Sequence, residues 1–106
     1  MKLWLDDIRP APVGWVHVRS VNDARNLLES NTVTEASLDH DLGDYAADGG
    51  DAWRLVDWMA EQNVWPTESF TVHSANPIGS RRMLETAGRY GPYAPAHPMS
   101  RTLRAW

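Results

Sequence analysis

Short apolar runs of strand-forming residues alternate along this chain with longer segments whose apolar residues recur at helical spacing. The strand-type runs cover residues 2–6, 15–18, 33–38 and 70–72. Helical stripes run from Val21 to Leu28, from Ala52 to Met59 and from Met83 to Ala87. Strands that alternate with helices pair in parallel through right-handed crossovers. The pattern therefore predicts a small, three-layer, doubly wound parallel α/β sheet of about four strands, with three main helices on its two faces.

Local signals mark where two of these helices begin and where one ends. Ser20 is placed to cap the first helix. Asn76 is placed to cap the third, with Pro77 at the first helical position. Gly88 is expected to end that third helix. The helix boundaries are thus predicted from capping chemistry as well as from periodicity.

The length of the chain limits the number of domains. At 106 residues and 42% hydrophobic, the chain is expected to form one domain over residues 1–106 with a single core. Residues 1–89 carry the alternating pattern and form the predicted core. Residues 90–106 are rich in glycine and proline and follow neither period. We expect them to form an irregular tail, with His97 structural and Trp106 packed on the core.

Composition and charge argue against several classes of protein. A net charge of −4 disfavours bulk nucleic-acid binding and adhesion to anionic membranes. No apolar run approaches the length of a membrane span, and the first residues are too acidic for a signal peptide. There is no cysteine, hence no disulfide framework and no thiolate site. We expect a cytoplasmic protein.

Carboxylates close two of the predicted strands. Asp6 and Asp7 end the first strand, and Asp39 ends the third. Ligands of doubly wound sheets bind outside the carboxyl ends of the strands, so these side chains are expected to face one crevice. Such a set suits Mg²⁺ or Mn²⁺, and we predict Asp6, Asp7 and Asp39 as metal ligands. The alternative is that Asp7 caps the following turn and Asp6 pairs with Arg9.

Most of the aspartates lie either at the end of the first strand or within residues 39–51. Crowded carboxylates repel one another unless a cation lies among them, which also favours a metal site. The alternative is a solvated acidic loop, which we favour for Asp44 and Asp48.

Two histidines lie at the same predicted edge, and we predict catalytic roles for both. His40 follows Asp39, and His73 follows the fourth strand. Imidazole titrates near neutral pH, so either could transfer a proton to an attacking or leaving oxygen. The alternative for each is a hydrogen-bonded structural residue. Asp41 is the predicted partner that would orient a histidine or a water molecule.

The start of the third predicted helix is a candidate phosphate site. Ser74 and Asn76 lead into it, and the free N–H groups of a helix N-terminus attract phosphate. Arg81 and Arg82 in its first turns, together with Arg9, are candidate substrate-binding residues. The alternatives are plain N-capping by Asn76 and solvated arginines.

The order of these residues resembles the receiver domain of two-component signalling. That resemblance implies that Asp6 and Asp7 hold Mg²⁺, that Asp39 accepts a phosphoryl group, and that Ser74 is the hydroxyl residue of the site. A receiver also places a lysine after its fifth strand. Here the only lysine is Lys2, at the opposite end of the first strand, and the sequence shows no evident fifth strand.

Three longer motifs narrow the resemblance: Leu-Trp-Leu-Asp-Asp-Ile-Arg-Pro-Ala-Pro, Ser-Leu-Asp-His-Asp-Leu-Gly and Val-His-Ser-Ala-Asn-Pro-Ile-Gly. Together they resemble the cyclic-phosphate processing receiver domains, a small receiver-like (flavodoxin-like) family, over about residues 2–84. The resemblance implies metal-dependent processing of cyclic phosphates, such as the 2′,3′-cyclic ends of nucleotides or RNA.

Three functions remain open at this stage. The first is a metal-dependent phosphoesterase, in which His40 or His73 protonates the leaving oxygen and Ser74 holds phosphate oxygens. The second is a signalling receiver in which Asp39 takes a phosphoryl group. The third is a non-catalytic protein, for example one encoded by a phage, that binds a phosphate ligand or a protein partner. Aromatic anchors favour interfaces, and the candidates for such anchors are Trp15, Trp53, Trp58 and Trp65.

Overall fold

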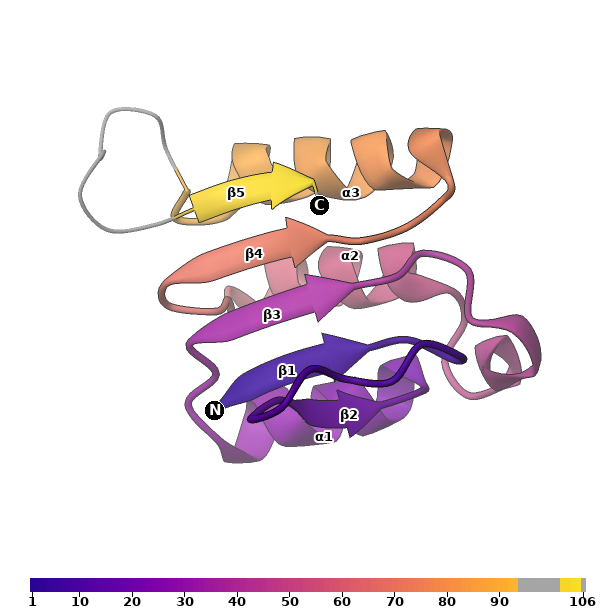
Figure 1. The fold of residues 1–106 in the computed structure, drawn as a ribbon. Helices are drawn as coiled ribbons and strands as arrows, with labels where there is room; N and C mark the ends of the chain where they lie inside the picture. Colours follow the sequence, from indigo (N-terminus) through magenta and orange to yellow (C-terminus); the bar gives the residue numbers. More distant parts are fainter. Residues whose placement is uncertain (94–101, 106) are drawn as a thin grey trace.

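The computed structural model describes residues 1–93 and 102–105. Its elements, in chain order, are β1 (Lys2–Leu5), β2 (Val16–Val18), α1 (Val21–Ser30), β3 (Glu35–Leu38), the 3₁₀ helix η1 (Gly43–Ala47), α2 (Ala52–Gln62), β4 (Ser69–Val72), α3 (Pro77–Tyr90) and β5 (Thr102–Ala105) (Figure 1). No helix within the described residues combines the length and the apolar character needed to cross a bilayer. The alternation of strands and helices follows the sequence prediction.

All strands run parallel in one sheet, in the order β2-β1-β3-β4-β5. The order reverses at β1, which pairs with β2 on one side and β3 on the other. Leu5, Leu38 and Val72 are in register at the carboxyl ends of β1, β3 and β4. The predicted parallel, receiver-like α/β fold is therefore confirmed, and the ends of three strands meet at one edge.

The tail contains a strand that the sequence did not reveal. We expected irregular chain after residue 90, whereas Thr102–Ala105 forms β5 and pairs with β4, with Ser69 opposite Thr102. A four-residue segment carries little periodicity of its own, and the pairing partner comes from a distant part of the chain. The expectations for His97 and Trp106 concern residues outside the described part of the chain.

The three helices lie along one face of the sheet (Figure 1), whereas we expected helices on both faces. The reason is the direction of the crossovers. The connections β2 to β3, β3 to β4 and β4 to β5 all advance across the sheet in the same direction, and right-handed crossovers in one direction place their helices on one face. The connection from β1 to β2 runs the other way, and residues 6–15 contain no helix. This loop replaces a helix at that side of β1.

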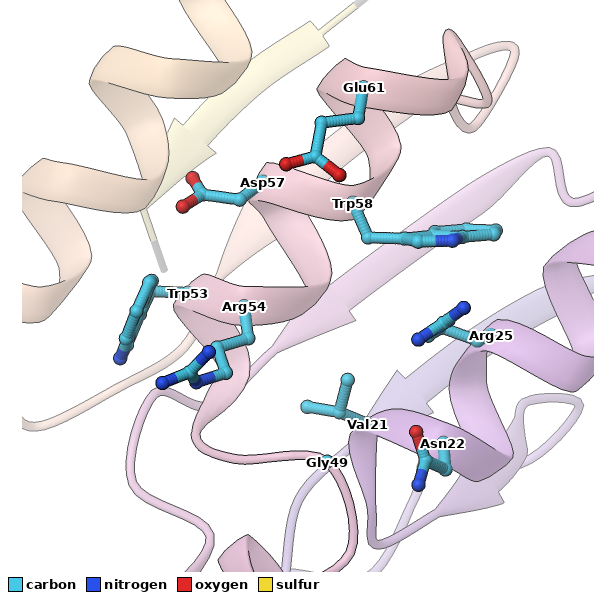
Figure 2. Close-up of a pocket in the computed structure, with 9 residues that line it drawn as sticks. All are labelled: Val21, Asn22, Arg25, Gly49, Trp53, Arg54, Asp57, Trp58 and Glu61. Atoms are coloured by element: carbon cyan, nitrogen blue, oxygen red, sulfur yellow. The ribbon is translucent and has the colours of Figure 1, made fainter.

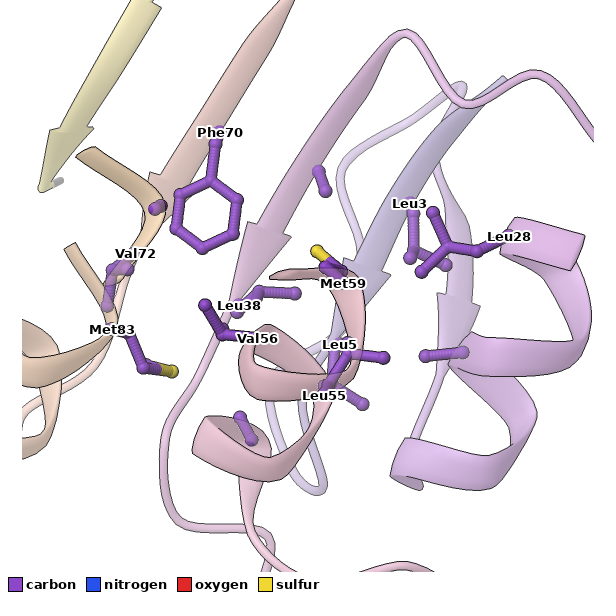
Figure 3. Close-up of a cluster of buried hydrophobic side chains, with 14 of the residues drawn as sticks. Leu3, Leu5, Leu28, Leu38, Leu55, Val56, Met59, Phe70, Val72 and Met83 are labelled. Carbon is purple, nitrogen blue, oxygen red and sulfur yellow. The ribbon is translucent and has the colours of Figure 1, made fainter. Parts of the chain in front are cut away.

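The hydrophobic core lies between the sheet and these helices (Figure 3). The strands contribute Leu3, Leu5, Leu38, Phe70 and Val72, and the helices contribute Leu28, Leu55, Val56, Met59 and Met83. Because strand side chains alternate between faces, the paired residues Leu3, Ala36 and Phe70 all point to the helices. Burial of this apolar surface is the main force that holds the sheet and the helices together.

The other face of the sheet is polar and aromatic but is still buried at its centre. Trp4, Ser37 and Thr71 lie side by side across β1, β3 and β4, and each is buried. Trp15, in the loop before β2, packs edge-on against Trp4 with ring centroids 6.1 Å apart. Two residues further along the strands, the same face continues into the carboxyl ends, where the polar side chains of the site lie.

The predicted caps are present, but α3 ends later than predicted. Ser20 Oγ accepts the backbone N–H of Asp23, and Asn76 Oδ1 accepts the backbone N–H of Gly79. Pro77 is the first residue of α3. We expected Gly88 to end this helix, whereas the helix continues to Tyr90. A glycine ends a helix through its backbone conformation, and the mere presence of glycine does not impose that conformation.

Candidate functional site

The structure brings the three predicted carboxylates together. Asp6 and Asp7 follow β1, Asp39 follows β3, and one ligand oxygen from each lies within 4.8 Å of the others. The pairing of β1 with β3 produces this arrangement, because the backbone N–H of Asp39 bonds to the carbonyl of Leu5. Carboxylates from adjacent strands therefore converge on one point at the edge of the sheet.

Asp6 is fully buried and strongly hydrogen-bonded. Its Oδ1 accepts the backbone N–H groups of Ile8 and Arg9, each at 2.8 Å, and its Oδ2 lies 2.9 Å from Nε2 of His73. Burial by itself raises the pKa of Asp6, but the bonds from Ile8, Arg9 and His73 outweigh burial and lower this pKa below its ordinary value. Asp6 is thus held as an anion.

Asp39 is in a different electrostatic position. Burial raises its pKa, and the nearby charge of Asp6 raises it further, against a hydrogen bond from Ser74 and one from the backbone N–H of His40. A neighbouring cation would therefore stabilise the ionised form of Asp39. The two strand-end carboxylates together form a site of excess negative charge.

Asp7 is half-buried, and the loop after β3 approaches it closely. A β-carbon added at Gly43 would lie 2.8 Å from Asp7 Oδ2, and Gly43 has a φ of +56°. Glycine suits this position because it tolerates both the close approach and the left-handed backbone. We had considered Asp7 as the cap of the turn after β1; in the structure Asp6 accepts the N–H groups of that turn.

The donor set fits a divalent cation of the Mg²⁺ or Mn²⁺ type. Such ions take carboxylate oxygens together with water and phosphate oxygens. Asp6, Asp7 and Asp39 supply the carboxylates, and the pKa of Asp39 is raised first by burial and then by the charge of Asp6, both of which a bound cation would offset. Arg9 does not neutralise the cluster by an ion pair, since its Nη1 donates to the carbonyl of His73 at 2.6 Å.

A cavity of about 370 Å³ opens beside the carboxylates. It is lined by Asp7, Ile8, Arg9, Asp39, Asp41, Gly43, Ser74, Ala75 and Asn76. Three loops, which follow β1, β3 and β4, contribute these residues. The N-terminus of α3 begins at one wall, where Asn76 Oδ1 accepts the N–H of Gly79 and Ser74 Oγ accepts the N–H of Asn76. The cavity thus joins a carboxylate cluster to polar groups that can bind phosphate oxygens.

His73 is enclosed and is not among the residues that line this cavity. Its Nε2 faces Asp6 at 2.9 Å and its Nδ1 faces Ser37 Oγ at 2.7 Å. The ring also stacks on Trp4, with centroids 3.8 Å apart and planes 7° apart. Burial lowers the pKa of His73, although the Asp6 carboxylate opposes this change. Both nitrogens are engaged inside the protein.

His40 does not line the cavity either, but its side chain contacts residues that do. Its Nδ1 is 2.9 Å from Asp41 Oδ1, and the side-chain nitrogen of Asn76 lies 3.3 Å from Asp41 Oδ2. The hydrogen bond from His40, supported by Asn76, lowers the pKa of Asp41. The predicted pairing of Asp41 with a histidine therefore occurs, and both Asp41 and Asn76 line the cavity.

The structure separates the three arginines that we considered as substrate contacts. Arg9 lines the cavity. Arg81 lies beside a different hollow with Pro77 and Ile78. The guanidinium of Arg82 lies 4.4 Å from the ring centroid of Trp53. Only Arg9 of these three is thus placed at the carboxylate site.

Three residues of the site were missed by sequence reasoning: Trp4, Ser37 and Gly79. Trp4 and Ser37 lie two positions before Asp6 and Asp39, so the period of two along each strand places them on the same face as the carboxylates. Gly79 lies against the ring of His40, where an added β-carbon would be 2.5 Å from the ring. The sequence signal that could have identified Gly79 was its position three residues after the N-cap.

The tryptophans proposed as interface residues are half-buried in the structure. Trp65 packs against Phe70 and Tyr93, and Trp15 packs against Trp4. Trp53 and Trp58 line a second hollow of about 290 Å³ between α1 and α2 (Figure 2). The guanidinium groups of Arg54 and Arg25 lie over Trp53 and Trp58. Part of each indole surface is therefore already used within the fold.

The order of the strands, the carboxylates at the ends of β1 and β3 and the hydroxyl residue after β4 define a receiver-like domain. Comparison with family models makes the class more specific. Residues 1–89 match the model of the cyclic-phosphate processing receiver domain, and the chain belongs to this family. Comparisons with curated proteins and with solved structures found no significant match.

Proposed function

We propose that this protein is a metal-dependent phosphoesterase that opens cyclic phosphates, with 2′,3′-cyclic nucleotides or RNA ends as substrates. The observation that carries the proposal is the convergence of Asp6, Asp7 and Asp39 within 4.8 Å at a cavity that also reaches the start of α3. Membership in the cyclic-phosphate processing family supports the choice of substrate. Mg²⁺ or Mn²⁺ bound by the three carboxylates would stabilise negative charge on the phosphate and activate water.

The chain's own residues would orient the phosphate in the cavity. The amide of Asn76 and the guanidinium of Arg9 line it and are able to donate hydrogen bonds to phosphate oxygens, and the hydroxyl of Ser74, which bonds to Asp39, can do so by exchanging that bond for one to the phosphate. The cavity volume of about 370 Å³ lies near the lower end of the range for ligand pockets, which suits a ligand as small as a terminal cyclic phosphate.

His40 is the better candidate for the proton donor. In the reaction, water attacks phosphorus and gives up a proton to the solvent, one phosphorus–oxygen bond of the ring breaks, and the released ribose oxygen takes a proton. His73 has both nitrogens engaged by Ser37 and Asp6. His40 is oriented through Nδ1, whose proton faces the Asp41 carboxylate, so the doubly protonated ring is the form that can donate, and it donates from Nε2.

The test is turnover of 2′,3′-cyclic nucleotides and of short oligoribonucleotides with cyclic ends, with Mg²⁺ or Mn²⁺ and with EDTA as control. A linear monophosphate product that forms only with metal supports the proposal. If wild-type protein with either metal leaves both substrates intact, the proposal fails.

The alternative of a phosphoaccepting receiver has one supporting observation, the hydrogen bond between Ser74 and Asp39. Against it, Lys2 lies at the amino end of β1, where its Nζ is 3.2 Å from Glu35. It is therefore at the opposite edge of the sheet from Asp39. Incubation with acetyl phosphate and Mg²⁺ followed by intact-mass measurement decides between the two, because a receiver gains one phosphoryl group.

A further inference from the structure

The surroundings of His73 in the structure do not suit a proton donor. Its ring lies flat against Trp4 and is buried, and His73 is not among the residues that line the cavity. Its two nitrogens are bonded to Ser37 and Asp6 at 2.7 and 2.9 Å. These bonds join the centre of β3, the end of β4 and the end of β1, so three strands meet at one imidazole.

The direction of these hydrogen bonds follows from the chemistry of the groups. An ionised carboxylate only accepts hydrogen bonds, so the Nε2 that faces Asp6 must carry a proton. A neutral imidazole has one protonated nitrogen, so Nδ1 is an acceptor and the hydroxyl of Ser37 donates to it. Ser37 is fully buried and thereby selects the tautomer of His73.

Asp6 is held from both sides by this arrangement. The N–H groups of Ile8 and Arg9 bond to Oδ1, and His73 bonds to Oδ2. Rotation of the carboxylate would break at least one of these bonds in a buried site, where unpaired polar groups are costly. Oδ2 accepts a hydrogen bond from His73 and has a second lone pair, which is available to a cation.

We infer that Ser37 and His73 are a positioning pair, which fixes the carboxylate of Asp6 as a cation ligand and does not exchange protons with the substrate. The inference rests on the proposed metal site. Mg²⁺ and Mn²⁺ require well-defined ligand geometry, and groups that orient a ligand commonly change metal affinity by ten- to a hundredfold. Trp4 supports the pair by stacking on the ring of His73.

The test measures binding of Mn²⁺ alone, without substrate, by titration calorimetry or by the EPR signal of free Mn²⁺. His73→Phe keeps an aromatic ring for the stack on Trp4 but removes the donor to Asp6, and it should weaken Mn²⁺ binding by on the order of ten- to a hundredfold. His73→Gln keeps an N–H donor and should recover most of that affinity. Ser37→Ala should weaken binding less than His73→Phe.

Ser80→Ala is the matched control for Ser37→Ala. Within the described residues Ser80 Oγ is buried without a hydrogen-bond partner, and Ser80 lies on α3 and does not line the cavity. Its loss should leave Mn²⁺ affinity unchanged. Circular dichroism of each variant checks the fold, and comparison of the phenylalanine and glutamine variants separates loss of the donor from loss of the fold.

A second measurement does not depend on metal or on any variant. Nitrogen-15 NMR at neutral pH in EDTA should find His73 with its proton on Nε2. A proton on Nδ1 would overturn the inference, as would wild-type Mn²⁺ affinity in a folded His73→Phe protein. Mn²⁺ binding with the expected variant effects but no cyclic-nucleotide turnover would support the positioning pair and remove the proposed activity. Failure of the wild type to bind Mn²⁺ would overturn both.

Discussion

The ring of His40 lies directly against Gly79 in the first turns of α3, and a β-carbon at residue 79 would approach the ring to 2.5 Å. The glycine thus admits the imidazole between the helix and Asp41. This contact links the orientation of the candidate proton donor to a helix residue that carries no functional group.

Replacing Gly79 with alanine is therefore expected to reduce cyclic-phosphate turnover at least tenfold by displacing His40. Alanine favours helix by about 1 kcal/mol over glycine, which offsets part of the cost of the clash, so the protein should remain folded. The matched control is Gly88→Ala, an exposed glycine of the same helix, which should raise the melting temperature and keep the activity. Equal activity in both variants would contradict the role assigned to this contact.

His40 itself should affect turnover but not metal binding. The bond from this residue to Asp39 comes from its backbone N–H, which a side-chain substitution leaves in place. His40→Gln is expected to lower kcat by on the order of 10²- to 10⁴-fold, the usual contribution of a general acid, and to leave Mn²⁺ affinity unchanged. Kinetics and calorimetry on the same preparation check both parts. An unchanged kcat would exclude His40 as the proton donor.

Asp39→Asn should separate a metal site from a structural carboxylate. The substitution keeps the size of the side chain but removes a charge, so metal affinity should fall by on the order of tenfold or more and turnover should be lost. Burial raises the pKa of Asp39, and the charge of Asp6 raises it further, so the ionised form destabilises the metal-free fold and its removal should not lower the melting temperature.

The control for Asp39→Asn is Asp44→Asn, which removes an exposed carboxylate from η1 in the same acidic segment. It should bind Mn²⁺ as the wild type does. If Asp39→Asn unfolds the protein, and millimolar Mg²⁺ or Mn²⁺ does not shift the melting temperature of the wild type, the metal-site argument fails.

Acid should destabilise the metal-free protein through His73. Burial lowers the pKa of His73 below 6.5, so the unfolded chain binds this proton more tightly than the folded protein does. The stabilising contribution is therefore complete above pH 6.5 and is lost as the pH falls through the lowered pKa of the folded state. Thermal unfolding between pH 7.5 and 5 in EDTA should show a steeper loss of stability for the wild type than for His73→Gln. Parallel curves would contradict this assignment.

Features that depend on neighbouring residues could be predicted from the sequence. The caps of α1 and α3 involve residues three positions apart, and Ser20 and Asn76 bond as expected. The positions of Asp6, Asp7 and Asp39 at strand ends followed from where each apolar run stops. Because strands of a parallel sheet present their carboxyl ends at one edge, these local signals sufficed to predict the carboxylate cluster.

Features that depend on distant pairing could not be predicted in this way. The strand Thr102–Ala105 has too little periodicity to be recognised alone, and it exists through its pairing with β4. The single helical layer depends on the direction of each crossover, which follows from the strand order. The same alternation of strands and helices along the chain is compatible with helices on one face of the sheet and with helices on both faces, so the alternation does not distinguish the two arrangements.

The sequence by itself determined which chemical groups this protein places at the edge of its sheet, because alternation along a strand and the end of an apolar run are local properties. Only the tertiary structure decided what each group can do. His40 and His73 both follow predicted strands, but register places His73 between Asp6 and Ser37 and leaves His40 in contact with Asp41, which lines the cavity. The two histidines differ because the accessibility and the hydrogen-bond partners of each depend on three strands that meet only in the folded chain.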